Sequence, residues 1–284
     1  MADFLAQSRA VRISPRTALV LAVAAVLGLA MFGWPLFAQP QPGAQAHGLD
    51  APFVFMATLP VLILVVLAEL SSGGIDAKAL AMLGVLSAIN AGLRPLSAGT
   101  GGIELVFFLL VLAGRVFGPG FGFVLGSTSL FTSALLTAGV GPWLPFQMLS
   151  SSLIGLGAGL LPKRPRGRTE IAMLGVYGVF AAYFFGFLMN LWHWPFLLGS
   201  NLTGATAGLE FVPGAPVLEN LHRFAVYTVL SSTLGWDTGR AVTNLAAIIL
   251  VGPAVLTVLR RAARRAAFDA PVSFAPARSG PAGR

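Results

Sequence analysis

Polar side chains capable of recognising a small molecule gather at a few points of this otherwise apolar chain. They stand at the ends of long apolar runs, in the company of four of the five tryptophans. A rim of aromatic rings with a few hydrogen-bond donors and acceptors is what a pocket for a flat, polar molecule needs. The polar members are Arg94, Glu104, Gln147, Asn190, Asn220, Arg223, Asp237, Arg240 and Asn244, and the tryptophans are Trp143, Trp192, Trp194 and Trp236.

For two pairs of residues within this set, the sequence predicts a specific interaction. Glu104 begins an apolar run, where an unpaired carboxylate is costly, and we expect Arg94 to be its partner across the Gly-rich loop 97–102. A purely structural ion pair is the alternative. Trp143 and Gln147 are four residues apart and share one face of a helix start, where they could stack on and hydrogen-bond a ligand. For any single tryptophan, the competing interpretation is an anchor in the interfacial aromatic belt.

Residue patterns that support enzymatic chemistry are missing from the sequence. It has no Walker A pattern, no His-Glu-x-x-His, no Gly-x-Ser-x-Gly and no cysteine. We therefore expect no enzyme, no cofactor and no metal in this chain. Metal ligation by His193 together with His222 is the alternative to interfacial hydrogen bonding by these two side chains.

The composition is that of an integral membrane protein. Of 284 residues, 56% are hydrophobic and 10% are charged, whereas a soluble domain carries about 25% charged residues. Apolar runs of spanning length predict an all-α membrane protein. The net charge of +8 does not indicate nucleic-acid binding, because the cations lie at helix ends rather than on one basic face.

The apolar runs predict about eight transmembrane helices. The run 221–234 is about 14 residues long, too short to cross reliably, and the segment 235–240 lies between it and the last predicted span. Whether residues 191–240 form a pocket lid or an interfacial helix is open. For the first span, a cleaved signal peptide is the alternative to a retained helix. The predicted spans are 17–38, 51–69, 78–94, 103–115, 121–138, 139–161, 171–190 and 241–259.

The distribution of Lys and Arg predicts the orientation. With eight spans and the N-terminus inside, fifteen of the eighteen cations fall on the inner side, so both termini are expected in the cytoplasm. We expect a multi-pass protein of a bacterial plasma membrane. Its predicted parts are a cytoplasmic N-terminus (1–16), two N-terminal transmembrane helices (17–76), a six-helix core (77–262) and a disordered cytoplasmic tail (263–284).

Small residues recur every four positions on three of the predicted helices. In the span 78–94 they are Gly84, Ala88 and Gly92, next to Ser87 and Ala91. Such faces let helix backbones approach closely, either inside the bundle or against another molecule. For the glycines of 118–126 and 155–159 we expect packing inside the bundle.

These features together resemble the substrate-binding (S) component of energy-coupling factor (ECF) transporters, over about residues 78–262. The resemblance is carried by six stretches and by the acid after the loop. They are 79–94, 97–102 with Glu104, 112–126, 141–161, 189–192 and 235–240. The family core has six helices, so the two N-terminal helices are an addition whose role is open.

The resemblance implies a subunit that binds a vitamin from outside and releases it inside after toppling in the membrane. Its partners would be a transmembrane coupling subunit and two ATPases that use the ATP. Small residues of the first core helix would contact the coupling subunit, here Ala81, Gly84, Ala88 and Ala91. The resemblance implies a substrate site at the loop 97–102 with Trp143, Gln147, Asn190, Trp192, Trp236 and Asn244. To this set the polar cluster adds Arg94 and Glu104 as predicted substrate-binding residues.

A self-sufficient, proton-coupled permease is the alternative function, with Glu104 as the proton site. Against it, spans 121–138 and 171–190 contain no ionisable groups except Tyr177 and Tyr183, and no inverted repeat is visible. The substrate is not readable from the residues. Flavins, pterins, thiamine-like molecules and corrinoids all fit a Trp-rich rim.

Overall fold

The computed structural model describes residues 13–33, 60–61, 63–64, 66–68, 71, 77–97, 102–137, 139–197 and 202–266. Across these residues the regular elements are helices, as predicted from the apolar runs. They are α1 (Pro15–Phe32), α4 (Ala77–Ser97), α5 (Val106–Phe117), α6 (Pro119–Leu136), α7 (Leu144–Leu160), α8 (Arg168–His193), η3 (Trp194–Leu197), η4 (Gly204–Thr206), α9 (Val217–Thr228), η5 (Val229–Asp237), α10 (Thr238–Leu250) and α11 (Gly252–Ala266).

Three described helices, α1, α6 and α8, are long and apolar enough to cross a membrane. The helix Val217–Leu250 and α11, which meet at a bend of 66°, make a fourth if they count as one span. The structure thus supports a multi-pass membrane protein, with three or four candidate spans among the described residues rather than the eight that the sequence predicts. The count of eight, the cytoplasmic termini and the four-part division stay predictions, and most of the predicted span 51–69 lies outside the described residues.

Glycines bring α6 and α7 into the closest contact of the bundle. A Cβ added at Gly122 would overlap the backbone carbonyl of Gly155, and one added at Gly126 would overlap the backbone of Ser151. Beside this crossing, the hydroxyls of Ser127 and Ser152 share a hydrogen bond of 2.5 Å. The expected packing role of these glycines inside the bundle is therefore confirmed.

The last third of the chain differs from its prediction, because the run 221–234 and the first half of the predicted span 241–259 belong to one helix. Val217–Leu250 is one helix, whose middle, η5, is π-helical. Inside it, the hydroxyl of Thr238 donates to the carbonyl of Thr233, five residues back, at 2.6 Å. A π-helical segment admits extra residues without breaking the helix, so the segment 235–240, with its two glycines, stays helical here. The real break comes at Val251, inside the predicted span 241–259.

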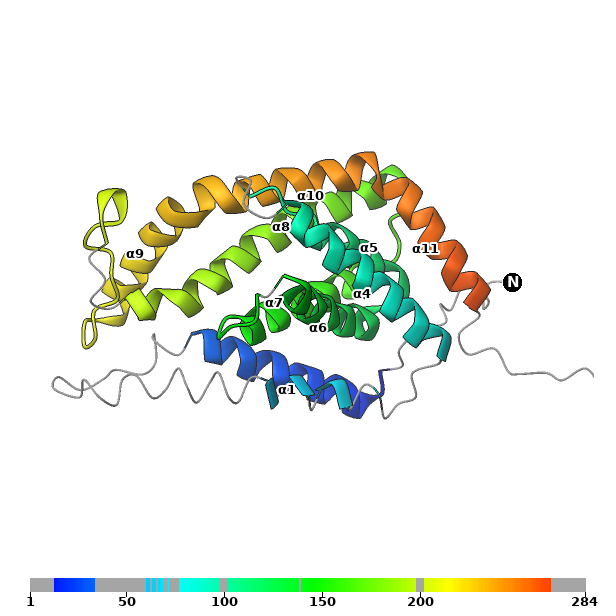
Figure 1. The fold of residues 1–284 in the computed structure, drawn as a ribbon, viewed down its shortest axis with the longest axis horizontal. Coiled ribbons are helices and arrows are strands. Elements are labelled where there is room, and N and C mark those ends of the chain that lie inside the picture. The colour runs from blue at the N-terminus through cyan, green and yellow to red at the C-terminus, as the bar shows by residue number, and fades with distance from the viewer. Residues whose placement is uncertain are drawn as a thin grey trace, which may run out of the picture.

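Helix α10 packs beside part of α8, and α11 turns away beyond them (Figure 1). Gly175 and Gly178 of α8 allow this approach, because a Cβ at either position would press on Leu245 or Ile248 of α10. The pairing brings the π-helical segment next to the C-terminal half of α8. The polar residues of 232–244 consequently face α5 and α8 rather than solvent.

Helix α1 packs on the core through one face only. Its buried residues are Thr17, Leu21, Ala24, Gly28 and Phe32. At its C-terminal end the ring of Phe32 meets the ring of Phe146 on α7 edge-on, with centroids 5.1 Å apart. Leu19 and Val26 on the opposite face are 65% and 67% exposed, as expected for side chains that face lipid.

Candidate functional site

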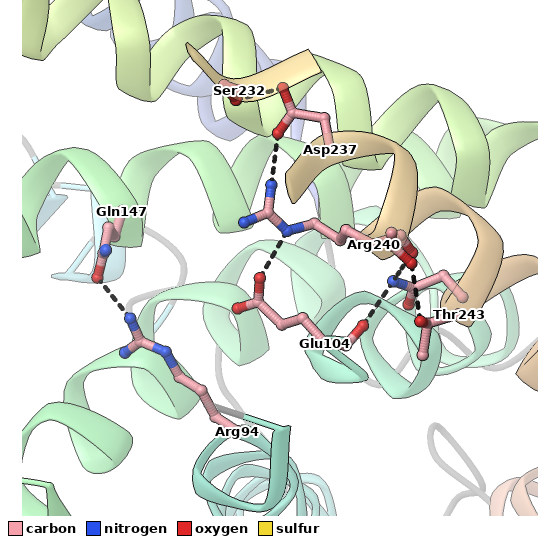
Figure 2. Close-up of polar contacts among 9 residues, drawn as sticks. Arg94, Glu104, Gln147, Ser232, Asp237, Arg240 and Thr243 are labelled. Atoms are coloured by element: carbon pink, nitrogen blue, oxygen red, sulfur yellow. Dashed lines mark hydrogen bonds and ion pairs between the residues drawn. The ribbon is translucent and has the colours of Figure 1, made fainter. Parts of the chain in front are cut away.

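The strongest polar feature near the predicted site is an arginine held between two carboxylates. Arg240 of α10 donates from Nε to Glu104 at 2.5 Å and from Nη1 to Asp237 at 2.8 Å (Figure 2). The exposed fractions of these side chains are 12% for Arg240, 18% for Glu104 and 1% for Asp237. We call Glu104, Arg240 and Asp237 the outer triad, after the side of the membrane that the Lys and Arg distribution predicts for this end. One cation between two anions leaves it with a formal charge of −1.

The π-helical segment and α8 fix the geometry of the outer triad. The hydroxyl of Ser232 donates to the second oxygen of Asp237 at 2.5 Å, which orients the carboxylate (Figure 2). A Cβ at Gly186 of α8 would overlap the same carboxylate, so only glycine leaves room for Asp237 there. The guanidinium of Arg240 lies 5.1 Å from the ring centroid of Phe185, close enough for a cation–π contact.

Asn244 lies one helical turn beyond Arg240 and ties α10 to the segment before α5. Its side-chain nitrogen donates to the backbone carbonyls of Glu104 and Arg240, both at 2.8 Å. The side chain is fully buried, and its oxygen has no hydrogen-bond partner among the described residues. Asn244 and Glu104, two of the predicted site residues, are thus brought together.

Arg94 makes a side-chain hydrogen bond with Gln147, while the carboxylate of Glu104 acts on it electrostatically, as predicted. Its guanidinium donates from Nη2 to the side-chain oxygen of Gln147 at 3.0 Å, and Figure 2 shows these side chains pointing toward one another. Glu104 also forms an ion pair with Arg240, which the sequence did not predict. The prediction chose Arg94 because it is close in sequence across a loop, whereas helix packing supplies this second cation from 136 residues away.

The predicted tryptophans divide into exposed and buried rings. Trp143 and Trp236 are 40% and 48% exposed. Trp143 also donates from its indole nitrogen to the carbonyl of Gly139 at 3.2 Å. Trp192 is 8% exposed and packs on Phe146 with ring centroids 5.1 Å apart. The two exposed rings are accessible to a ligand, while Trp192 belongs to the core beside Gln147.

Two further predicted features lie close to these residues. Gly102, at the end of the predicted Gly-rich loop, has a φ of 83° and touches the backbone of Trp236, where any larger residue would collide. Asn190 of α8 is half-buried, and its side-chain nitrogen has no hydrogen-bond partner among the described residues. Positions 98–101 of the loop lie outside the described residues.

The predicted coupling face of α4 is only partly exposed. Ala81, Gly84 and Ala88 are exposed, and a Cβ at Gly84 would meet no atom within 4 Å. Ala91 is 1% exposed, because it lies on the face of α4 that is turned toward the bundle. The open small-residue face of α4 therefore consists of the first three positions, without Ala91.

At the other end of the bundle lies a cluster that the sequence did not predict. Glu170 of α8 is 2% exposed and accepts from Nε of Arg115 and from Nη2 of Arg260, each at 2.7 Å. Arg115 also donates to the carbonyls of Leu161 and Pro162. We call Arg115, Glu170 and Arg260 the inner triad. The signal in the sequence was a lone acid directly after the basic block 163–168.

Among the described residues, no group of three or more His, Cys, Asp or Glu side chains could hold a metal ion. His193 packs on Trp192, with ring centroids 5.8 Å apart. The groups available at the outer end are thus guanidinium, carboxylate, amide and indole. They suit recognition of an organic molecule by hydrogen bonds and stacking.

The long apolar helices make this chain a multi-pass membrane protein. A model of the family of ECF-type riboflavin transporters, S component, matches residues 74–240, more than half of the chain, and the chain belongs to this family. It is a family of substrate-binding transporter subunits, not a class of enzymes. No curated protein and no solved structure matches the chain.

Proposed function

We propose that this chain is the substrate-binding subunit of an ATP-driven importer and that its substrate is riboflavin or a close flavin relative. The family match over residues 74–240 carries the proposal. It spans all the helices from α4 to η5, including both ends of the Arg94–Gln147 contact and the whole outer triad. The two N-terminal spans and α11 lie outside it.

The outer end offers the groups that a flavin needs. A flavin ring is flat and carries several hydrogen-bond acceptors on one edge, and its sugar-derived chain carries hydroxyls. Gln147 and Arg94 supply amide and guanidinium donors, Asn190 supplies a buried amide nitrogen, and Trp143 supplies an exposed ring for stacking. We assign the substrate site to this end, between α4, α7, α8 and the π-helical segment.

A transmembrane coupling subunit with two ATPases is the partner set that the family implies. The exposed side of α4, with Ala81, Gly84 and Ala88, is the contact we propose, since small residues let another helix approach closely. A Cβ at Gly84 meets no atom within 4 Å among the described residues, so Gly84→Leu would add bulk to this open face. We expect it to abolish assembly with the coupling subunit and to leave riboflavin binding by the isolated chain unchanged.

The proton-coupled permease is less well supported. Glu104, its proposed proton site, is ion-paired with Arg240 at 2.5 Å. Proton uptake by this carboxylate would therefore cost the energy of a largely buried ion pair. No observation in the described residues favours this second function over the first.

Titration of the purified full chain with riboflavin, followed by quenching of flavin fluorescence, tests the proposal. Reconstituted vesicles then separate the two mechanisms. We expect tight binding by the chain alone, no ATP hydrolysis by the chain alone, and uptake only when the coupling subunit, ATPases and ATP are present. Uptake driven by a pH gradient without these partners would establish the permease instead.

A further inference from the structure

The end of the molecule that holds the inner triad also carries a positively charged surface. Contacts bring together the start of α4, the end of α5, the loop before α8 and the helix α11. Among the described residues gathered here, Glu170 is the only carboxylate, and it is buried and already shared by two arginines. The exposed cations of this surface include Arg164, Arg166, Arg168, Arg261, Arg264 and Arg265.

Helix α11 is held in place at two points. Near its middle Arg260 donates two hydrogen bonds of 2.7 Å to Glu170. At its C-terminal end the side chain of Lys78 donates to the carbonyl of Ala266 at 2.9 Å, a contact that satisfies one of the free carbonyls of a helix end. Leu256 and Leu259 on the inner face are 3% and 6% exposed. These contacts fix which face of α11 packs on the bundle and which face points away from it.

The face that points away combines cations with an apolar side chain. Val258 is 66% exposed and lies three and seven residues before Arg261 and Arg265, so the three share one side of the helix. α11 also leaves the direction of the preceding helix by 66°, which Figure 1 shows as a sharp turn. A helix with this composition and direction fits the membrane interface, with apolar groups toward the acyl chains and cations at headgroup level.

We propose that the exposed face of α11, together with the 164–168 segment, binds anionic phospholipid headgroups. The guanidinium groups recognise the headgroup phosphates by charge-assisted hydrogen bonds. The exposed Val258 favours a lipid over an acidic protein surface, because its side chain can enter the acyl region. The proposal does not depend on the substrate or on which side of the membrane this end faces.

Native mass spectrometry of the full chain, titrated with phosphatidylglycerol or phosphatidylcholine in detergent, tests this binding. We expect adducts with phosphatidylglycerol at about one-tenth of the concentration needed for phosphatidylcholine, given the attraction of several cations for an anionic lipid. The variant Arg261→Gln/Arg264→Gln/Arg265→Gln should lose this preference. Arg261→Lys/Arg264→Lys/Arg265→Lys keeps the charges and should retain most of it.

Two controls make the outcome decisive. Arg223→Gln removes a partly exposed cation from the opposite end and should leave the preference unchanged. The glutamine variant should unfold at the wild-type temperature, since its three side chains are exposed. Equal binding of both lipids by the wild type, or an undiminished preference in the glutamine variant, overturns the proposal. Loss of assembly with the ATPases in that variant, without any lipid preference in the wild type, would assign the surface to a protein partner.

Discussion

The two ends of the bundle carry ion clusters of opposite composition. The outer triad holds one arginine between two carboxylates, whereas the inner triad holds one carboxylate between two arginines. Their formal charges are consequently −1 and +1. Both join helices that are far apart in the sequence, so both contribute to the fold. What surrounds them is different.

The surroundings indicate which cluster belongs to a binding site. In the inner triad, Arg115 also donates N–H groups to backbone carbonyls of the loop after α7. The outer triad lies beside a π-helical segment, a type of helix that is frequent at functional sites. Near it, Asn190 and Asn244 keep buried polar atoms without partners among the described residues. Saturated groups stabilise a fold, while unsatisfied ones can still accept a ligand.

The largest effect is expected from Glu170→Ala in the inner triad. The substitution leaves Arg115, which is 7% exposed, as an uncompensated charge, and such losses cost about 3–5 kcal/mol. We expect a marked fall in the thermal unfolding temperature in detergent. Glu219→Ala is the matched control, because its pair with Arg223 is solvent-exposed and worth about 0–1 kcal/mol. Equal losses in the two variants would mean that the inner triad is not a structural centre.

A smaller loss of stability, combined with a loss of binding, is expected from Gly186→Ala. The new Cβ would displace the Asp237 carboxylate from Arg240, and overpacking of this kind costs about 1–3 kcal/mol. Riboflavin affinity should fall together with stability. Gly92→Ala on α4 meets no atom within 4 Å and should leave stability unchanged or slightly raised. If the Gly186→Ala protein binds riboflavin with wild-type affinity, the outer triad is not part of the substrate site.

The Gln147→Ala and Trp143→Ala variants test the rim of the proposed site without touching either triad. Loss of one hydrogen bond of about 1 kcal/mol should weaken riboflavin binding about fivefold for Gln147→Ala. A smaller decrease is expected for Trp143, whose ring is partly exposed and tied to Gly139. Fluorescence titration measures both. If neither variant changes the affinity, the 141–148 segment is only a membrane anchor.

The sequence predicted the helices from α4 to α8 within a few residues, because apolar periods and Gly or Pro breaks are local signals. Gly118, with a φ of 95°, and Pro119 after it mark the α5–α6 boundary in both the sequence and the structure. The continuous helix 217–250 was missed for the same reason. Residues 235–240 interrupt the apolar pattern locally, and contacts with α8 keep them helical.

The sequence identified the important polar residues more reliably than it identified the residues with which they pair. Glu104 and Arg94 were correctly expected to interact, but the ion pair of Glu104 with Arg240 was not foreseen. Arg240 reaches Glu104 across 136 positions, and Arg260 reaches Glu170 across 90. Such pairs depend on which helices lie side by side, and one sequence does not contain that information. Ala91 turned inward for a similar reason, since helix spacing alone does not tell which of two small-residue faces packs inside.

The riboflavin affinities of Arg240→Gln and Arg260→Gln test most directly the claim that the outer cluster serves the substrate site and the inner one the fold. Each substitution removes one guanidinium from one triad. We predict that Arg240→Gln weakens riboflavin binding by the purified chain at least tenfold, equivalent to about 1.4 kcal/mol, and that Arg260→Gln leaves it within about twofold. Equal affinities in the two variants, or a larger loss in Arg260→Gln, would contradict the account.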